Sequence, residues 1–287
     1  MRKTFLIVLL LVCFIGVTGC TTQSTTQIAA TTLPVYEFTE YLCNGTGIPV
    51  TRLITEEVSC LHDYTLRTAQ MRAIEGAELV VVSGGGLEDF LGDVIDNKTL
   101  VDASMDISLD CGHEHSHESH QHEHDPHYWL SPQNAMAMVE NICTELTKHY
   151  PEHADTFAAN KEPLLARLTQ LDLDAQNALQ HLQSRELITF HDGFGYLAQA
   201  YDLHIVKAIE EESGSEASAA ELIEIIQLVN EHNLPAIFVE ENGSVSAAEI
   251  IAKETGAKVF TLNMAMSGNS YFDAMEHNIS TLKEALG

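Results

Sequence analysis

The sequence predicts an α/β protein of two lobes, each a mostly parallel four-stranded sheet with flanking helices, joined by one long helix. Short aliphatic runs alternate with helical patterns along most of the 287 residues. This alternation is typical of parallel sheets that helices cover on both faces. Two such series are present, and an apolar stripe with helical spacing separates them. The composition, 45% hydrophobic and 20% charged, is that of a globular protein with a core.

The first series begins at Gln27 and predicts an N-terminal lobe over residues 28–150. After a first helix that ends at Cys43, the expected elements are a strand over 48–54, a helix over 65–75, a strand over 79–82 and a short strand at 100–101. The run at 83–86, a serine and three glycines, fits neither GxGxxG nor a Walker loop, so we interpret it as a tight turn after the strand over 79–82. Ser131 and Pro132 then open a helix as its N-cap and first residue.

The apolar stripe predicts a long linking helix within residues 151–184. Its members are spaced by three, four or seven residues and are Phe157, Leu164, Leu168, Leu171, Ala175, Leu179 and Leu182. Pro163 should kink or restart this helix near its beginning. The C-terminal lobe, residues 185–287, repeats the alternation. Its expected strands are 187–190, 203–206, 236–239 and 259–262, and its expected helices are 196–201, 219–231, 247–255 and 271–286.

Residues 1–19 have the pattern of an export signal. Arg2 and Lys3 precede an uninterrupted apolar run over 5–15, which is shorter than the roughly 17 residues that a membrane-spanning helix needs. The segment ends in Val-Thr-Gly-Cys20, which resembles a bacterial lipoprotein signal, in which cleavage exposes the cysteine and lipid is attached to its sulfur. The polar residues 20–27 suit a flexible tether. A simple secretory signal with a chance cysteine is the alternative.

The charge balance excludes one class of partner. The chain has 42 Asp and Glu against 14 Lys and Arg, a formal net charge of −28. Such a surface repels phosphate backbones, so nucleic-acid binding is excluded, and it attracts cations. Of the 15 histidines, seven lie between His113 and His127.

Three histidines occupy positions where α/β folds build binding sites. His62 follows the expected strand over 48–54, His127 precedes a helix, and His191 lies at the carboxyl end of the expected strand over 187–190. Ligands of open α/β sheets gather beyond the carboxyl ends of strands, and imidazole nitrogens bind Zn²⁺ at about 2.0–2.1 Å. One site between the lobes could therefore collect all three side chains, although each one alone could be an ordinary loop residue.

Four segments resemble one family, the metal-receptor lipoproteins of bacterial ABC importers for zinc and manganese (cluster A-I or cluster 9 solute-binding proteins). The segments are CLHD at 60–63, DPHYWLSP at 125–132, FHDGFGY at 190–196 and ETGAKV at 254–259. DPHxWLSP and FHDxxGY are specific, and the other two are weak alone. The resemblance runs from about Gln27 to the end of the chain. It implies two α/β lobes joined by a long helix, and a monomeric receptor, not an enzyme, that hands its metal to an ABC permease.

The resemblance also implies the ligand set. The metal histidines of the family fall on His62, His127 and His191, and its usual fourth ligand, an aspartate, falls on Asn263. A neutral amide oxygen is a poor zinc ligand beside three imidazoles, so we expect water as the fourth ligand, with Asn263 and Cys60 as alternatives. Zn²⁺ is therefore the expected transported ion, and Mn²⁺ is the less favoured one.

Residues 112–124 form a low-complexity tract whose composition cannot build a core. It is expected as a loop over the cleft that binds accessory metal through His113, His115, His117, His120, His122 and His124. In the resembling family such a loop marks the zinc receptors. A solvated spacer is the alternative.

Export would place the cysteines that remain after signal removal in an oxidising setting, where four cysteines allow three pairings. Cys43 ends the first helix, away from the cleft, whereas Cys60 follows the strand over 48–54 at the cleft end. A strand of on the order of 20 Å separates them, too far for a disulfide, which needs Cα atoms within about 7 Å. We therefore expect Cys43 to pair with Cys143, and Cys60 with Cys111.

The leading hypothesis is a Zn²⁺ receptor at the outer face of the bacterial cytoplasmic membrane, anchored by lipid on Cys20. An extracytoplasmic zinc-dependent hydrolase is a second possibility, since a three-histidine site with an open position can activate water. No GxSxG motif supports it. A surface metal buffer or adhesin without a transport role is the third.

Overall fold

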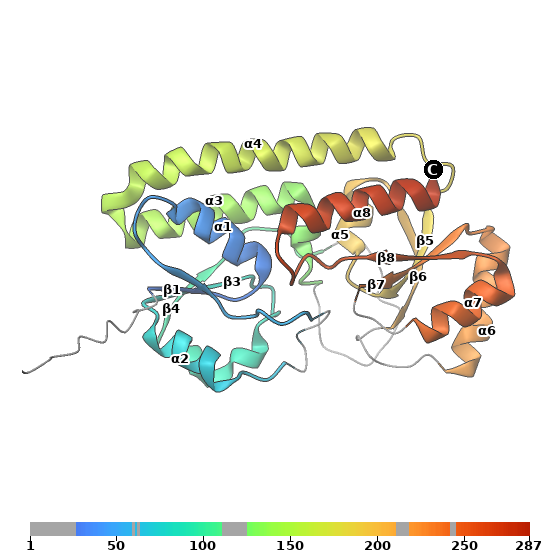
Figure 1. Cartoon of the computed structure of the whole chain (residues 1–287), viewed down its shortest axis with the longest axis horizontal. Coiled ribbons are helices and arrows are strands. Elements are labelled where there is room, and N and C mark those ends of the chain that lie inside the picture. The colour runs from blue at the N-terminus through green and yellow to red at the C-terminus, as the bar shows by residue number, and fades with distance from the viewer. Residues whose placement is uncertain (1–26, 59–60, 62–63, 111–124, 211–217, 242–244) are drawn as a thin grey trace, which may run out of the picture.

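The computed structural model describes residues 27–58, 61, 64–110, 125–210, 218–241 and 245–287. These residues form two lobes, each built on a four-stranded sheet (Figure 1). All strand pairs are parallel. The strand orders are β2-β1-β3-β4 and β6-β5-β7-β8, so the two sheets have the same topology. The predicted fold class is confirmed.

The N-terminal lobe begins with strand β1 and ends with helix α3. Its elements are β1 (Ile28–Ala30), α1 (Leu33–Cys43), β2 (Val50–Arg52), α2 (Thr68–Gly76), β3 (Leu79–Val82), the 3₁₀ helix η1 (Asp89–Ile95), β4 (Thr99–Asp102), the 3₁₀ helix η2 (Tyr128–Leu130) and α3 (Pro132–His149). Strand β3 reads as an unbroken apolar run because both of its faces are covered. Leu79 and Val81 pack into the main core, whereas Val80 and Val82 pack into a second cluster with Ile74 of α2.

The glycine run after β3 is a turn, in agreement with the sequence interpretation. Gly84, Gly85 and Gly86 all have positive φ values, of +82°, +65° and +85°. A Cβ atom on Gly84 would lie 1.9 Å from Oδ1 of Asp102, so this position requires glycine for space as well as for its backbone conformation. The turn places Glu88, the residue before η1, next to the end of β3.

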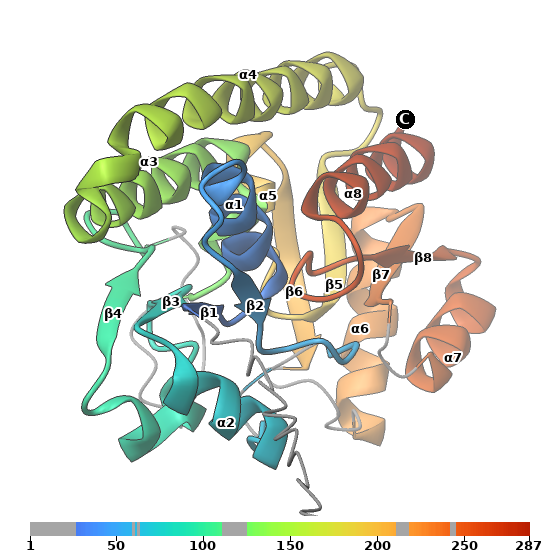
Figure 2. The same ribbon diagram turned by 60° about the vertical axis from the view of Figure 1, so that its left-hand side comes forward.

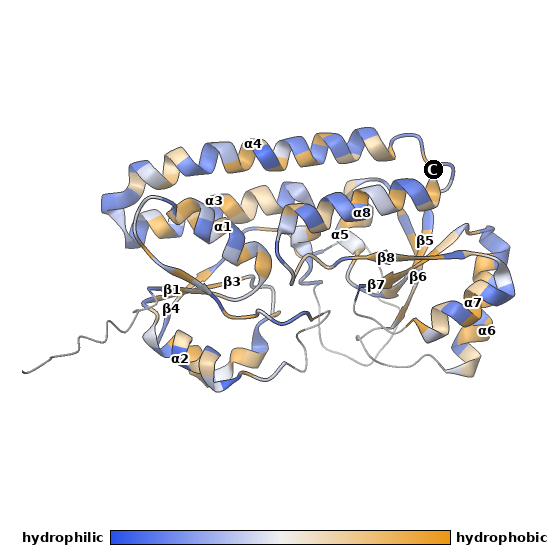
Figure 3. Cartoon of the chain, in the orientation of Figure 1, coloured by the Kyte–Doolittle hydropathy of each residue, from blue (hydrophilic) through white to orange (hydrophobic). Residues whose placement is uncertain are grey.

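A short 3₁₀ helix, η3 (Pro151–His153), leads into the long helix α4 (Ala154–Leu179). Helix α4 runs along both lobes, and the two views agree that it lies beside α8 (Figures 1 and 2). It continues through Pro163 without interruption, so the expected restart does not occur. Its apolar and polar residues alternate along its length, as Figure 3 shows, because one face packs on α1, α3 and α8 and the other faces solvent.

The C-terminal lobe repeats the strand–helix alternation of the first. Its elements are β5 (Glu186–His191), α5 (Gly195–Ala200), β6 (His204–Glu210), α6 (Ala219–His232), β7 (Ala236–Glu240), α7 (Ser246–Thr255), β8 (Lys258–Leu262) and α8 (Tyr271–Leu286). Within the described part of the chain, no helix is both long enough and apolar enough to cross a membrane.

One hydrophobic core extends through both lobes. Its buried members include Phe38 and Trp129 of the N-terminal lobe, Leu168 of α4, and Phe238 and Met275 of the C-terminal lobe. The lobes are therefore packed together by apolar side chains, in addition to being connected by the chain.

Hydrogen bonds connect the C-terminal lobe to residues 125–130 of the N-terminal lobe. Trp129 donates its indole N–H to the carbonyl of Met264 at 2.8 Å, and the hydroxyl of Tyr271 donates to the carbonyl of Trp129 at 2.7 Å. The hydroxyl of Tyr196 donates to the carbonyl of Asp125 at 3.0 Å. All of these side chains are buried, so the segment that carries His127 is held by C-terminal residues on two sides.

The expected disulfide between Cys43 and Cys143 is not formed in the structure, in which both residues are free thiols. They are 4% and 6% exposed and belong to the main core. Burial raises the pKa of Cys43 to about 12 and also raises the pKa of Cys143. Each therefore serves as a small apolar side chain between packed helices, a role that placing cysteines along strands did not take into account. The other expected disulfide, Cys60–Cys111, lies outside the described residues.

Candidate metal centre

Two of the three expected ligands meet where the lobes face each other. His127 immediately precedes η2, and His191 is the last residue of β5. Their ring centroids are 5.1 Å apart with the rings nearly perpendicular, at 86°, and each residue is only 2% exposed. Since Zn–N bonds measure about 2.0–2.1 Å, two imidazoles on one ion have centroids within about 6 Å of each other. The observed spacing suits a shared metal ion.

Each imidazole has a buried carboxylate on its Nδ1 atom. Oδ1 of Asp125 lies 2.8 Å from Nδ1 of His127 and also accepts the backbone N–H of His127 at 2.9 Å. Oε1 of Glu240 lies 3.3 Å from Nδ1 of His191. A carboxylate at Nδ1 fixes the tautomer and ring orientation of a metal-binding histidine. In both residues Nε2 is thus the nitrogen suited to a metal ion.

The Nε2 atom of His127 is also suited to a metal ion because of its surroundings. Its Nε2 atom is buried and has no hydrogen-bond partner in the described part of the chain. A buried polar nitrogen without a partner costs free energy. A metal ion bound to Nε2 would remove that cost.

The environment keeps Asp125 ionised. Desolvation by burial would raise the pKa of Asp125, but hydrogen bonds from His127 and the nearby charges of His127 and His191 outweigh it, so the pKa lies below its usual value. An ionised carboxylate accepts the Nδ1 proton of His127 and leaves the electron pair of Nε2 for a cation.

Glu240 is a site residue that sequence analysis missed. Thr189 of β5 pairs with Phe238 of β7, and this register brings Glu240 beside His191, two residues further along each strand. The residue is 4% exposed. The available signal was a charged residue at the very end of a buried apolar strand, at the sheet edge that His191 also occupies.

Gly193 provides space beside His191. A Cβ atom built on Gly193 would lie 2.8 Å from Nε2 of His191, 2.6 Å from its Cδ2 and 2.6 Å from the terminal methyl group of Met264. Cβ atoms do not approach other heavy atoms so closely, so any larger residue would displace the imidazole. Gly193, the first variable position of the FHDxxGY segment, therefore keeps the proposed metal-binding nitrogen accessible.

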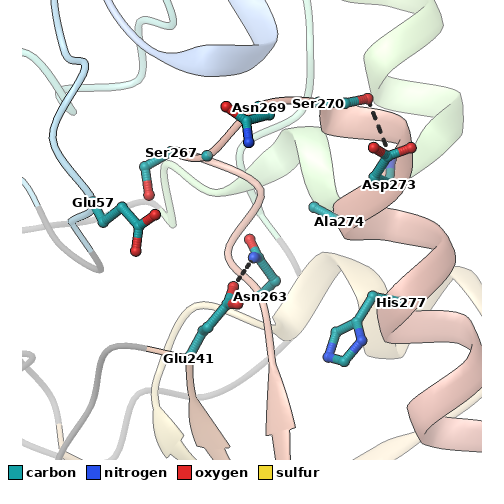
Figure 4. A pocket seen from close by; sticks show the side chains of 10 residues that line it. Glu57, Glu241, Asn263, Ser267, Asn269, Ser270, Asp273, Ala274 and His277 are labelled. Carbon is teal, nitrogen blue, oxygen red and sulfur yellow. Dashed lines mark hydrogen bonds between the residues drawn. The ribbon is translucent and has the colours of Figure 1, made fainter.

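Asn263, an expected alternative for the fourth ligand, follows β8 and is engaged elsewhere. Its Oδ1 accepts the N–H of Ala265 at 2.7 Å, and its Nδ2 donates to Oε2 of Glu241. It lines a cavity of about 270 Å³ together with Glu57 and His277 (Figure 4). These bonds favour water over Asn263 as the fourth ligand.

The remaining predicted site residues lie outside the described residues. They are His62, Cys60, Cys20 and the six histidines of the 112–124 tract. Among the residues that the structure describes, no group of three or more His, Cys, Asp or Glu side chains is placed to hold a metal ion. A centre on His127 and His191 therefore requires at least one ligand from elsewhere, and His62 remains the predicted one.

Nearly the whole chain is similar to known zinc-uptake and zinc-binding proteins. Residues 28–285 match a family model described as "Zinc-uptake complex component A periplasmic", or ZnuA. The chain is 30% identical over 286 residues to the zinc-binding protein AdcA of Streptococcus pyogenes, with 90% of this chain and 55% of AdcA covered. It thus spans about half the length of that relative.

Two further relatives match over nearly their whole length. The chain is 32% identical over 304 residues to the high-affinity zinc uptake system protein ZnuA of Bacillus subtilis, with 96% of this chain and 95% of ZnuA covered. Its fold is similar to that of the Zn(II)-bound ZnuA-like domain of Streptococcus pneumoniae AdcA, with a TM-score of 0.77 at 31% identity. That match covers 91% of this chain and 99% of the domain.

Proposed function

Because the chain belongs to the ZnuA family of periplasmic zinc-uptake components, we propose that it is an extracytoplasmic receptor that captures Zn²⁺ and delivers it to an ABC import permease. The observation that carries the proposal is the buried pair of His127 and His191, 5.1 Å apart and each held by a carboxylate. These ligands come from different lobes, so one metal ion would bridge them.

The chemistry of the donor atoms favours zinc. Imidazole nitrogens suit Zn²⁺, whereas oxygen-rich ligand sets suit Mn²⁺. His62 would supply a third nitrogen, and water would complete a four-coordinate centre. The net charge of −28 draws cations toward the molecule, and the histidine-rich tract at 112–124 would hold accessory ions in weaker sites.

The location and partners follow from the sequence. We propose that residues 1–19 direct export and that lipid on Cys20 anchors a monomer to the outer face of the cytoplasmic membrane. The permease in that membrane would be its protein partner, and no nucleic acid would bind. As a member of a family of uptake receptors, the protein would have no catalytic activity.

The test is metal binding by residues 21–287. One tight equivalent of zinc should remain after dialysis of the wild type, and His127→Ala or His191→Ala should abolish it, because each removes a bridging ligand. His181→Ala, at an exposed position, is the matched control and should retain the metal. Tight zinc binding by either site variant would refute the assignment.

Transport is tested in cells. Deleting the gene should impair growth when zinc is limiting, and the wild-type protein should restore growth whereas the double variant of His127 and His191 should not. Normal growth of the deletion strain would instead indicate a metal buffer or adhesin.

A further inference from the structure

A buried acidic residue outside the two ligand pairs lies at the carboxyl edge of the N-terminal sheet. Glu88 is 7% exposed. Its Oε1 accepts hydrogen bonds from the hydroxyl of Thr31 at 2.6 Å and from the N–H of Ser83 at 2.7 Å, and its Oε2 accepts from the N–H of Gly84 at 2.9 Å. Thr31 follows β1, and Ser83 follows β3. The carboxylate of Glu88 therefore joins the ends of two neighbouring strands.

The peptide held by Glu88 also contacts the segment that carries a metal ligand. The hydroxyl of Tyr128 donates a hydrogen bond to the carbonyl oxygen of Ser83, and Tyr128 is fully buried. Tyr128 directly follows His127 in the chain. Ser83 is thus fixed by Glu88 through its N–H and fixes Tyr128 through its carbonyl, which makes a continuous connection from Glu88 to His127.

We propose that Glu88 is a positioning residue for zinc capture, which in its ionised form fixes Ser83 and, through Tyr128, the segment of His127, so that protonation of Glu88 weakens zinc binding. The proposal rests on the proposed function as a zinc receptor. It adds a dependence on pH that originates away from the ligands themselves.

The hydrogen bonds distinguish the two protonation states of Glu88. Its carboxylate accepts from three donors, the hydroxyl of Thr31 and the N–H groups of Ser83 and Gly84. A neutral carboxylic acid carries an O–H that needs an acceptor of its own. Because the N–H groups can only donate and the Thr31 hydroxyl already donates to Glu88, the neutral acid must give up or reverse at least one of these bonds, and the end of β3 is then held less firmly.

The burial of Glu88 and the groups around it place the protonation of its carboxylate near neutral pH. Burial raises the pKa of Glu88 to about 7, the three hydrogen bonds oppose that increase, and the negative charge of Asp102 on β4 adds to it. Tyr128 on η2 also faces Glu88, and Tyr196 of the C-terminal lobe faces Tyr128. Above about pH 7 Glu88 is ionised and zinc binding is tight. As the pH falls below that value, Glu88 takes up a proton and the affinity decreases.

The experiment compares zinc dissociation constants of residues 21–287 by chelator competition between pH 5.5 and 8.5. Glu88→Gln has nearly the same shape but cannot ionise. The measured quantity is the quotient of the variant and wild-type dissociation constants, because protonation of the histidine ligands is common to both and cancels. We expect a quotient of about ten at pH 8, in the range of effects of residues that support metal ligands, which falls toward one near pH 6.

Glu78→Gln is the matched control, because Glu78 is exposed and lies at the opposite end of the same strand, so its quotient should stay near one throughout. If Glu88→Gln does not fold, Tyr128→Phe tests the same connection and should give a quotient that falls with pH in the same way. A quotient that does not vary with pH, whatever its size, would overturn the proposal. Failure of the wild type to bind zinc would overturn the proposed function instead.

Discussion

Glu240 and Glu241 are adjacent in the sequence but occupy different environments. Glu240 is buried and contacts His191, whereas Glu241 is exposed and accepts a hydrogen bond from Asn263 (Figure 4). Glu240 is the last residue of β7 and Glu241 follows the strand; one glutamate reaches the candidate metal centre and the other lines the neighbouring cavity. The same substitution can therefore be compared at a buried glutamate beside the candidate metal centre and at an exposed glutamate next to it in the sequence.

Glu240→Gln should weaken zinc binding by about 10- to 100-fold, the usual effect of losing a partner that orients a metal ligand. The amide cannot provide the negative charge that favours a proton on Nδ1 of His191. Glu241→Gln should change the dissociation constant by less than about twofold, since exposed charges interact weakly. Chelator competition at pH 7.5 measures both. Equal effects of the two substitutions would contradict the role assigned to Glu240.

Single residues also show what the sequence alone could predict. His127 and His191 were candidates because one precedes a helix and the other lies at the carboxyl end of a strand, and the family resemblance of the DPHxWLSP and FHDxxGY segments selected them as expected ligands. Glu240 required the register of β5 against β7, which no local pattern contains. The hydrogen bonds of Asn263 depend on the path of the loop after β8, so its engagement with Ala265 and Glu241 was equally inaccessible.

At the scale of elements, the turn after β3 connects the fold to the site. Gly84 has a φ of +82°, and its missing side chain leaves room for Asp102 and Ser104. This close approach lets the N–H groups of Ser83 and Gly84 reach Glu88. Glycine is thus required at this turn for two reasons, its positive φ and the lack of room for a Cβ atom. The contribution of each reason to stability can be measured separately.

Gly84→Ala should destabilise the protein more than Gly45→Ala, although the two glycines have nearly the same φ, +82° and +83°. At Gly45 no atom lies within 4 Å of the added Cβ, so only the backbone cost of about 1–2 kcal/mol applies. At Gly84 the clash with Asp102 should bring the loss to about 3 kcal/mol or more. Urea unfolding of the metal-free proteins measures the difference, and equal losses would show that the turn relaxes.

Elements were predictable where local signals decide them and not where packing does. The apolar run of β3 and the Ser131–Pro132 start of α3 are local, and both elements form; Ser131 accepts the N–H of Asn134 as its cap. Pro163 is a strong local signal for a break, yet α4 continues through it because contacts with α1, α3 and α8 support the helix on both sides. Cys43 and Cys143 likewise became core residues because helices α1 and α3 bury them.

At the scale of the whole molecule, the continuous core predicts that metal-free protein unfolds in one transition. Zinc that binds only the native state adds RT ln(1 + [L]/Kd), about 4 kcal/mol at a thousandfold excess over Kd. For a chain of this size the midpoint should rise by on the order of 10 °C. Calorimetry with and without zinc tests both statements, and an unchanged midpoint would argue against a native metal centre. Magnesium at the same concentration is the control, because the site offers nitrogen ligands.

The position of α8 has a consequence for how the protein is made. This helix is formed by nearly the last residues of the chain, yet the hydroxyl of Tyr271 bonds to Trp129, its N–H bonds to Glu37 at 2.6 Å, and its ring stacks edge-on against Phe38 at 5.1 Å. The ribosome therefore synthesises the whole N-terminal lobe before it synthesises α8, which packs against that lobe. Until then the apolar side chains of Phe38 and Trp129 stay partly exposed. Chaperones bind exposed apolar surface of this kind, and proteases cleave chains that carry it. Nascent chains interrupted before residue 271 should for this reason be degraded rather than accumulate as a stable half.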